Sequence, residues 1–375
     1  MKPVTIKNAL IVTPDEVKKQ DLLIKNGKIA DIGSFDGGDV IDGEGMYLMA
    51  GFIDTHVHGV YGVAFDDTAA EFDPALEYEA AHGVTTLAAT TGTQDGFNLC
   101  SAFEHIASEA KRRTRGTKIA GIHAEGPCVS PARKGAMNEK CMIKPSAEVI
   151  RKFCSHADGM MKIITIAPEL EGALEAAEEA VRLGVKPSMG HTDATAPEAL
   201  TAIEHGFSRV THTCNGMRPF RHRDPGVLGV ALTDDRLMCE MICDFVHLDP
   251  ITVRLIFRAK GADRICIVSD TGMVSGLPDD DYRVYGKTRR SHCGAIYLED
   301  GTLAGSWHTV LKGVQNLYSL GIPLTDITRM ASVNPAKALG IENETGAIRK
   351  GLAADLVLLD SALNPVKVFI DGILQ

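Results

Sequence analysis

The sequence predicts an α/β protein, namely a (β/α)8 TIM-like barrel with a small β-sandwich domain built from both chain ends. Two observations predict this fold. Through the middle of the 375-residue chain, short apolar runs alternate with helix-length segments, which is the pattern of repeated strand–helix units. At both ends, short β-branched runs are separated by turn signals, which is the pattern of hairpins. A doubly wound open sheet is the alternative for the middle region.

The two ends of the chain are expected to pair with each other. The stretch VTIKNALIVTPDEVKKQDLLIKNGKIADIG, near the amino end, contains the turn signal KNG, and ADLVLLDSALNPVKVFIDGILQ has the same texture at the carboxyl end. We therefore expect residues 1–49 and 346–375 to form the small domain and residues 50–345 to form the barrel.

Eight segments of strand length fill the middle region, and each is rich in apolar or β-branched residues. In chain order they are residues 51–58, 85–91, 118–126, 162–168, 186–191, 209–213, 238–244 and 264–270. Amphipathic stretches such as residues 173–184 and 196–206 are typical of the helices that connect such strands.

The composition indicates a cytoplasmic globular protein and leaves an anionic small substrate possible. With 45% hydrophobic and 23% charged residues, the chain can bury a large core. A net charge of −10 argues against general binding to nucleic acid or to a membrane, and no apolar run approaches the ~18 residues of a spanning helix. The nine cysteines are scattered, and MKPVTIKNAL lacks the apolar core of a signal peptide, so we expect a reducing compartment.

Ionisable residues stand where several of these runs end, and a barrel carries its chemistry at that end of its strands. They are His56 and His58 in the first run, Glu125 in the third, His191 in the fifth, His212 in the sixth and Asp270 in the eighth. Imidazoles and a carboxylate suit Zn2+, and also Fe2+ or Mn2+, so the histidines and Glu125 are candidate ligands for one or two ions per subunit. Asp270 is a candidate proton acceptor for a metal-activated water. Its alternative role is to cap a following helix.

One loop is unusually basic for an acidic protein. Residues 215–226, NGMRPFRHRDPG, follow His212 closely and bring three arginines and a histidine together. Arginine suits bidentate recognition of phosphate or carboxylate, so the loop is a candidate anion site near the metal. A solvated surface loop is the alternative.

Several motifs occur together in an order that resembles one family. GFIDTHVHG, HAEGP, MGHTDA, THTCNGM, CDFVHLDP, VSDTGMVSGLPDDDY and GTLAGS are similar to motifs of the N-acetylglucosamine-6-phosphate deacetylase family, within the amidohydrolase superfamily. The resemblance extends over nearly the whole chain, including ASVNPAKALGI and GAIRKGLAADLVLLD near its end. It implies that Glu125, His191 and His212 bind a divalent metal and that Asp270 is the catalytic acid/base, and it leaves a second metal at His56 and His58 open.

The resemblance also implies a substrate, a reaction and a partner. The reaction is the hydrolysis of N-acetylglucosamine 6-phosphate to glucosamine 6-phosphate and acetate. The implied assembly is a homodimer in which an arginine of one subunit, here Arg223, reaches the phosphate of the substrate bound to the other. The implied substrate contacts are Ala136, Asn215, Gly216, Arg223, His247, Leu303, Ala304 and Gly305.

Three positions depart from the pattern of the family. Met137 stands where the family usually has a histidine, and Trp307 and His308 stand where small or aliphatic residues are common. These changes leave another N-acyl amino sugar, an N-acyl amino acid or a cyclic amide open as substrate. A barrel kept only as a binding module is a further alternative, and the presence of Asp270 and every candidate ligand argues against it.

Overall fold

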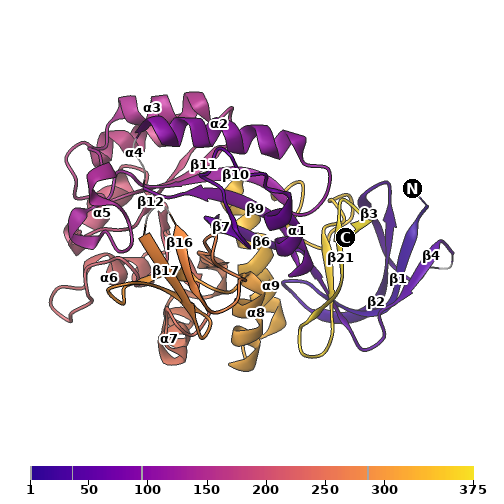
Figure 1. Ribbon diagram of the computed structural model, residues 1–375. Coiled ribbons are helices and arrows are strands. Elements are labelled where there is room, and N and C mark those ends of the chain that lie inside the picture. The colour runs from indigo at the N-terminus through magenta and orange to yellow at the C-terminus, as the bar shows by residue number, and fades with distance from the viewer. Residues whose placement is uncertain (1, 36, 94–95, 285–286) are drawn as a thin grey trace.

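The computed structural model describes residues 2–35, 37–93, 96–284 and 287–375. Eight parallel strands form a nearly closed barrel with helices around it, as the sequence predicts (Figure 1). The barrel strands are β6 (Phe52–Val57), β9 (Val84–Thr91), β10 (Lys118–Glu125), β11 (Met161–Ile166), β12 (Lys186–Met189), β13 (Arg209–Val210), β14 (Met238–Ile242) and β15 (Ile265–Val268). They neighbour one another in the order β6-β9-β10-β11-β12-β13-β14-β15, and each overlaps one of the eight predicted segments.

Burial explains why these strands read as apolar runs. Every residue of β9, VTTLAATT, is buried, because side chains fill the barrel on one face of the strand and helices cover the other. The described helices are α1 (Asp73–Ala81), α2 (Gly96–Arg112), α3 (Ala147–His156), α4 (Ala173–Arg182), α5 (Ala196–Glu204), α6 (Gly226–Thr233), α7 (Pro250–Lys260), α8 (Val310–Ser319), α9 (Leu324–Thr328) and α10 (Asn334–Leu339). Among the described residues, no helix has both the length and the apolarity needed to cross a bilayer.

Local signals in the sequence set the start of some helices. At α5, the side chain of Thr195 accepts from the backbone of Glu198, and the Glu198 side chain accepts from the backbone of Thr195 at 2.7 Å. This reciprocal pair is a capping box, and it satisfies amides that the first turn would otherwise leave unpaired. The helix that follows His191 therefore begins at a defined residue.

The barrel closes where β15 meets β6. At this seam, the segments that follow the two strands are joined by individual backbone hydrogen bonds. The amide of Asp270 donates to the carbonyl of His56 at 2.9 Å, and the amide of His58 donates to the carbonyl of Thr271 at 2.8 Å. The seam therefore brings Asp270 beside the two histidines at the end of β6.

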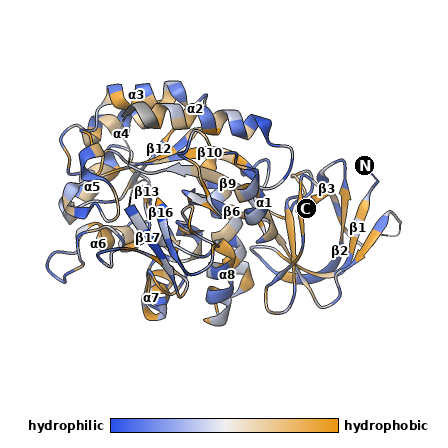
Figure 2. Ribbon diagram, viewed as in Figure 1, coloured by the Kyte–Doolittle hydropathy of each residue, from blue (hydrophilic) through white to orange (hydrophobic). Residues whose placement is uncertain are grey.

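Strands from both chain ends form a second, mixed sheet, so the prediction that the ends pair is confirmed. Its strands are β1 (Val4–Val12), β2 (Val17–Lys25), β3 (Lys28–Gly33), β4 (Asp39–Asp42), β5 (Tyr47–Ala50), β20 (Leu356–Leu359), β21 (Pro365–Ile370) and β22 (Ile373–Leu374). The order is β22-β21-β20-β5-β1-β2-β3, with β4 paired to β1. Ile6, Leu22, Leu48, Leu356 and Phe369 share one core, and Figure 2 colours much of β1 and β2 as hydrophobic. The exact division of the chain into two domains stays a prediction.

A four-stranded antiparallel sheet follows β15, and the sequence analysis did not predict it. Its strands are β16 (Asp281–Val284), β17 (Lys287–His292), β18 (Ala295–Leu298) and β19 (Leu303–Ser306). The amide of Ser306 donates to the carbonyl of Asp270 at 2.9 Å. A Cβ at Gly305, where φ is +104°, would lie 2.9 Å from that same carbonyl, so this close approach requires glycine. The sheet thus brings Gly305 and Ser306 beside Asp270.

Candidate metal-dependent active site

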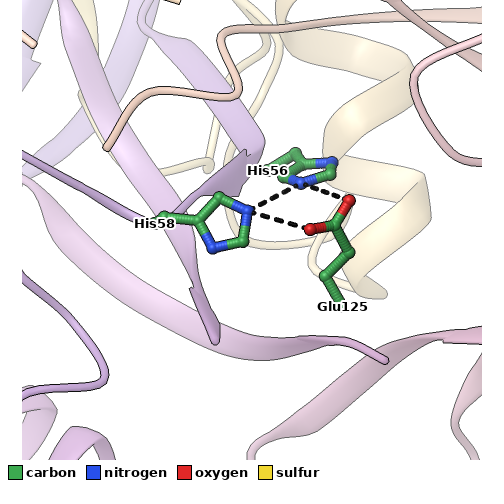
Figure 3. Close-up of side chains that lie close together, drawn as sticks. All are labelled: His56, His58 and Glu125. Atoms are coloured by element: carbon green, nitrogen blue, oxygen red, sulfur yellow. Dashed lines mark hydrogen bonds and ion pairs between the residues drawn. The ribbon is translucent and has the colours of Figure 1, made fainter. Parts of the chain in front are cut away.

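His56 in β6 and His58 just after it converge on the carboxylate that ends β10. His56 Nε2 and His58 Nε2 lie 3.2 Å apart. Glu125 places Oε2 3.2 Å from His58 Nε2 and Oε1 3.4 Å from His56 Nε2, and Figure 3 shows all three side chains pointing at one another. Because residues two apart in a strand share a face, the His-x-His spacing produces this pair directly.

The same carboxylate faces a second pair of histidines. Glu125 Oε1 lies 3.2 Å from His191 Nε2 and 2.8 Å from His212 Nε2, and these two nitrogens are 3.0 Å apart. His191 follows β12 and His212 follows β13, so the four histidines and Glu125 come from four strands of the barrel. Glu125 therefore belongs to two groups of three donors, either of which could hold a metal ion.

In three of the four histidines, a hydrogen bond at Nδ1 determines that Nε2 is the nitrogen facing Glu125. His191 Nδ1 lies 2.8 Å from the carbonyl of Arg133, and His212 Nδ1 lies 3.1 Å from the carbonyl of Asn215. His56 Nδ1 lies 3.0 Å from Glu240 Oε2. Since these oxygens only accept, each Nδ1 carries a proton, and Nε2 is the nitrogen that faces Glu125 and could bind a cation in place of a proton. Three oriented imidazoles around a buried carboxylate fit a divalent transition metal.

The charges of the cluster determine the ionisation of its carboxylate. Burial raises the pKa of Glu125, but the positive charges of His56 and His191 outweigh burial and hold the pKa well below its usual value. Glu125 is therefore an ionised carboxylate, which is the form that binds a cation.

Backbone strain is concentrated at the strand ends that form the site. His191, His212 and Asp270 have φ angles of 46°, 27° and 55°, in the left-handed region that residues other than glycine rarely adopt. Strain of this kind persists where the surrounding structure holds it, and it is enriched at functional sites.

Asp270 lies close to His56 and His58, on the other side of the seam between β15 and β6. Its Oδ1 lies 3.4 Å from His56 Nε2 and 3.5 Å from His58 Nε2. Burial raises the pKa of Asp270. The charge of His56 and the hydrogen bond with His58 outweigh this effect, so the pKa of Asp270 lies below its usual value. The described residues 271–280 form turns rather than a helix, so the alternative role of Asp270 as a helix cap is wrong.

The basic loop divides into a fixed part and an exposed part. Arg218 forms ion pairs with Asp193 at 2.9 Å and with Asp224 at 3.0 Å, which anchors the loop. Arg221 and Arg223 are exposed to solvent. The side chain of Arg223 is therefore accessible from solvent.

His247 is held by one neighbouring carboxylate. Its Nδ1 lies 2.7 Å from Asp244 Oδ2, and Asp244 Oδ1 accepts from the amides of Val246 at 2.8 Å and of His247 at 2.9 Å. The carboxylate of Asp244 thereby fixes both the orientation of the ring and the position of one proton.

Two of the other candidate substrate contacts, Asn215 and Gly216, adjoin histidines of the cluster. A Cβ at Gly216 would lie 3.0 Å from His191 Nδ1, so glycine leaves room for that ring. Asn215 donates from its amide group to the carbonyl of His212 at 3.3 Å. Met137 Sδ accepts from Thr93 Oγ1 at 2.8 Å, where the family usually has a histidine. Ala136, Leu303 and Ala304 are half-buried.

Sequence reasoning missed a buried ion pair beneath the cluster. Arg209, on β13, and Glu240, on β14, are 2% and 0% exposed, and Arg209 Nη2 lies 3.0 Å from Glu240 Oε1. A charged residue inside each of two otherwise apolar runs was the available signal, because a buried charge needs a partner.

The profile of the amidohydrolase family matches residues 47–374, and the site lies within that range. The chain belongs to the amidohydrolase family. It is 34% identical over 367 residues to N-acetylglucosamine-6-phosphate deacetylase of Lysinibacillus sphaericus. That match covers 96% of this chain and 94% of the relative. It is 31% identical over 335 residues to N-acetylgalactosamine-6-phosphate deacetylase of Escherichia coli O157:H7, which covers 89% of each chain.

A solved structure extends the likeness to the fold. The N-acetyl-D-glucosamine-6-phosphate deacetylase of Mycobacterium smegmatis, as a mutant in complex with N-acetyl-D-glucosamine-6-phosphate, has a TM-score of 0.92 at 30% identity. The match covers 99% of this chain and 98% of that one. The resemblance read from the sequence is confirmed.

Proposed function

We propose that this protein removes the acetyl group from N-acetylglucosamine 6-phosphate and releases glucosamine 6-phosphate and acetate. The observation that carries the proposal is the convergence of four histidines, Glu125 and Asp270 at one end of a barrel. The full-length similarity to amino-sugar phosphate deacetylases supports the choice of this reaction among those of the amidohydrolase family.

Glu125, His191 and His212 are the proposed ligands of a divalent metal, and Zn2+ is the first choice, before Fe2+ or Mn2+. His56 and His58, which share Glu125 with that group, are the proposed ligands of a second ion. A divalent ion supplies Lewis acidity that polarises an amide carbonyl and acidifies water.

Asp270 is the proposed acid/base of the reaction. Its low pKa leaves it ionised at neutral pH, so it can accept a proton from the attacking water. The same carboxyl can then return this proton to the departing amine nitrogen, and the group is ready for the next cycle.

His247 is the proposed hydrogen-bond donor to the carbonyl oxygen of the acetyl group. Asp244 engages Nδ1 and orients the ring, so Nε2 is the nitrogen left to contact that oxygen. Burial raises the pKa of Asp244, but the hydrogen bond and charge of His247 hold it below its usual value.

The proposed sugar-phosphate site is completed by a second subunit. Arg223 is exposed and thus available to the phosphate in a neighbouring subunit of a homodimer. Ala136, Asn215, Gly216 and the segment of residues 303–305 are the proposed contacts within one subunit. Placement in the cytoplasm stays a prediction from the composition.

Two amino sugars are candidates for the substrate. A relative acts on N-acetylgalactosamine 6-phosphate by name, and Met137, Trp307 and His308 depart from the pattern of the family. N-acetylgalactosamine 6-phosphate is therefore the second candidate substrate.

Release of acetate tests the proposal. Purified protein should be assayed with N-acetylglucosamine and N-acetylgalactosamine, each with and without the 6-phosphate, and with an N-acetyl amino acid and a cyclic amide as controls. We expect the highest kcat/KM for N-acetylglucosamine 6-phosphate. A preference for the cyclic amide or the amino acid would contradict the proposal, and equal rates on free and phosphorylated sugars would remove the phosphate site from it.

A further inference from the structure

The ion pair beneath the cluster has a geometry that stability alone does not explain. Replacing a buried ion pair with apolar residues of similar volume is often neutral or stabilising, because both charges must lose their hydration. Arg209 and Glu240 are nevertheless both buried at the centre of the barrel. A role in the site accounts for their presence.

Glu240 contacts one member of each histidine pair. Its Oε2 lies 3.0 Å from His56 Nδ1 and accepts from the backbone amide of His212 at 3.2 Å. The first contact fixes the imidazole of His56, whereas the second supports the strained backbone of His212, where φ is 27°. A single oxygen thus links the two groups of candidate ligands.

Arg209 pairs with Glu240 and holds its carboxylate in place. Its Nη2 lies 3.0 Å from Glu240 Oε1, on the side of the carboxylate away from the contact with His56, and 3.4 Å from Thr55 Oγ1. An ionised partner makes the hydrogen bond to an imidazole stronger and raises the basicity of the opposite ring nitrogen. The chain of contacts therefore runs from Arg209 through Glu240 to His56 Nε2.

We infer that Glu240, with Arg209 as its counter-charge, is the positioning residue that gives the His56–His58–Glu125 group its affinity for a second divalent ion. The inference rests on the proposed function, because it assumes that the His191–His212–Glu125 group holds the first ion. The first ion should depend less on Glu240, since the ring of His212 is held separately by the carbonyl of Asn215. Glu240 touches only the backbone of His212.

Binding of Mn2+ to the full-length protein tests the inference without an activity assay. Wild-type protein should bind two Mn2+ ions per chain, and electron paramagnetic resonance should show them as a spin-coupled pair. Glu240→Gln keeps an acceptor for His56 but removes the charge, so the second ion should bind roughly 10–100-fold more weakly. The first ion should bind with close to wild-type affinity, and the coupled spectrum should give way to that of isolated Mn2+.

Three further variants separate this role from general damage. Glu240→Gln leaves the charge of Arg209 unpaired, so Arg209→Met/Glu240→Gln, which removes both charges, decides the case if the single variant does not fold. His58→Ala should lose the second ion outright and identify it. Asp355→Asn weakens an ion pair outside the site, between the buried Asp355 and the half-buried Lys118 at 2.5 Å, and should lower stability without changing the affinity for either ion.

Each outcome bears on the inference. Two ions bound with wild-type affinity in the folded Glu240 variants would overturn it, as would a wild-type protein that binds one ion at saturating Mn2+. Loss of both ions together would overturn the selective role. A wild-type protein that binds two ions but releases no acetate would contradict the proposed function and leave this inference standing.

Discussion

Glu125 is the residue on which the site depends most, because its two oxygens face four imidazoles within 3.4 Å. The pKa of Glu125 is low because the positive charges of His56 and His191 outweigh the effect of burial. Asp270 shares this environment and is ionised for the same reason. Glu125 is thus surrounded by candidate ligands, and Asp270 lies within 3.5 Å of His56 and His58.

Asp270→Asn tests the proton-transfer role. Asparagine keeps the shape of the side chain but cannot accept a proton from water, so turnover of the acetylated substrate should fall by a factor of roughly 10²–10⁴. The metal content, measured by elemental analysis, should remain that of the wild type. A variant that keeps half of the wild-type rate would show that Asp270 has no part in proton transfer.

At this scale the sequence revealed most of the site, because the candidate ligands stand at strand ends where apolar runs stop. It did not reveal Glu240 or Arg209, whose roles depend on the pairing of β13 with β14 and on which face of the barrel each side chain occupies. It also left Arg218 as a candidate for anion binding, because its partners Asp193 and Asp224 are brought to it only by the folded loop.

Among the elements, the barrel strands were predictable and the small antiparallel sheet was not. β9 and β15 are continuous buried runs, and burial on both faces is what makes such strands apolar. In contrast, β16 and β17 are short and largely exposed, with charged residues such as Arg283 and Arg290, so they show no apolar pattern. Their position follows instead from the attachment of β19 to Asp270.

Helix α1 carries a buried carboxyl that the proposed chemistry does not use. Glu79 is 0% exposed, and neither of its oxygens has a hydrogen-bond partner among the described residues. Burial, with a smaller contribution from the charge of Asp54, raises the pKa of Glu79 well above its usual value. The folded protein therefore holds a proton there that the unfolded chain releases as pH rises.

Glu79→Met should stabilise the protein, and the gain should grow with pH. The unpartnered carboxyl costs about 1–3 kcal/mol. Above the unfolded pKa of about 4.5, the wild type should also lose up to about 1.4 kcal/mol per pH unit until the folded pKa is reached. Urea unfolding at a series of pH values measures this difference, with the exposed Glu175→Met as control. A variant less stable than the wild type at neutral pH, or a pH-independent difference, would contradict the assignment.

At the scale of the whole molecule, an acidic chain has one small basic region on its surface, here called the basic tip. The net charge is −10, yet Arg221, His222 and Arg223 are exposed together on one loop. Such a tip suits an anionic ligand better than a general polyanion, which the overall charge repels. In the proposed homodimer this ligand is the phosphate of the substrate in the other subunit.

Arg223→Ala should therefore weaken the use of phosphorylated substrate. A charged hydrogen bond to phosphate contributes on the order of 1.5–3 kcal/mol, so kcat/KM should fall by roughly one to two orders of magnitude. Activity on the unphosphorylated sugar, where measurable, should hardly change, because the lost contact is absent from that complex.

Mixed dimers show which subunit Arg223 serves. In dimers formed from Arg223→Ala and Asp270→Asn chains, one site would combine an intact Asp270 with an intact Arg223 from the partner. Random mixing should then restore about one quarter of wild-type activity, since half of the dimers are hybrids with one working site. Activity no higher than the average of the two parent variants would show that Arg223 acts within its own subunit.

The central claim is that the histidine–glutamate cluster holds the metal on which amide hydrolysis depends. Its most direct measurement is acetate release and metal content in one preparation, before and after removal of metal by a chelator, and again after Zn2+, Fe2+ or Mn2+ is returned. We predict that activity and metal are lost together and restored together in the wild type, and that His191→Ala recovers neither. A metal-free preparation that hydrolyses its substrate at the wild-type rate would contradict the account.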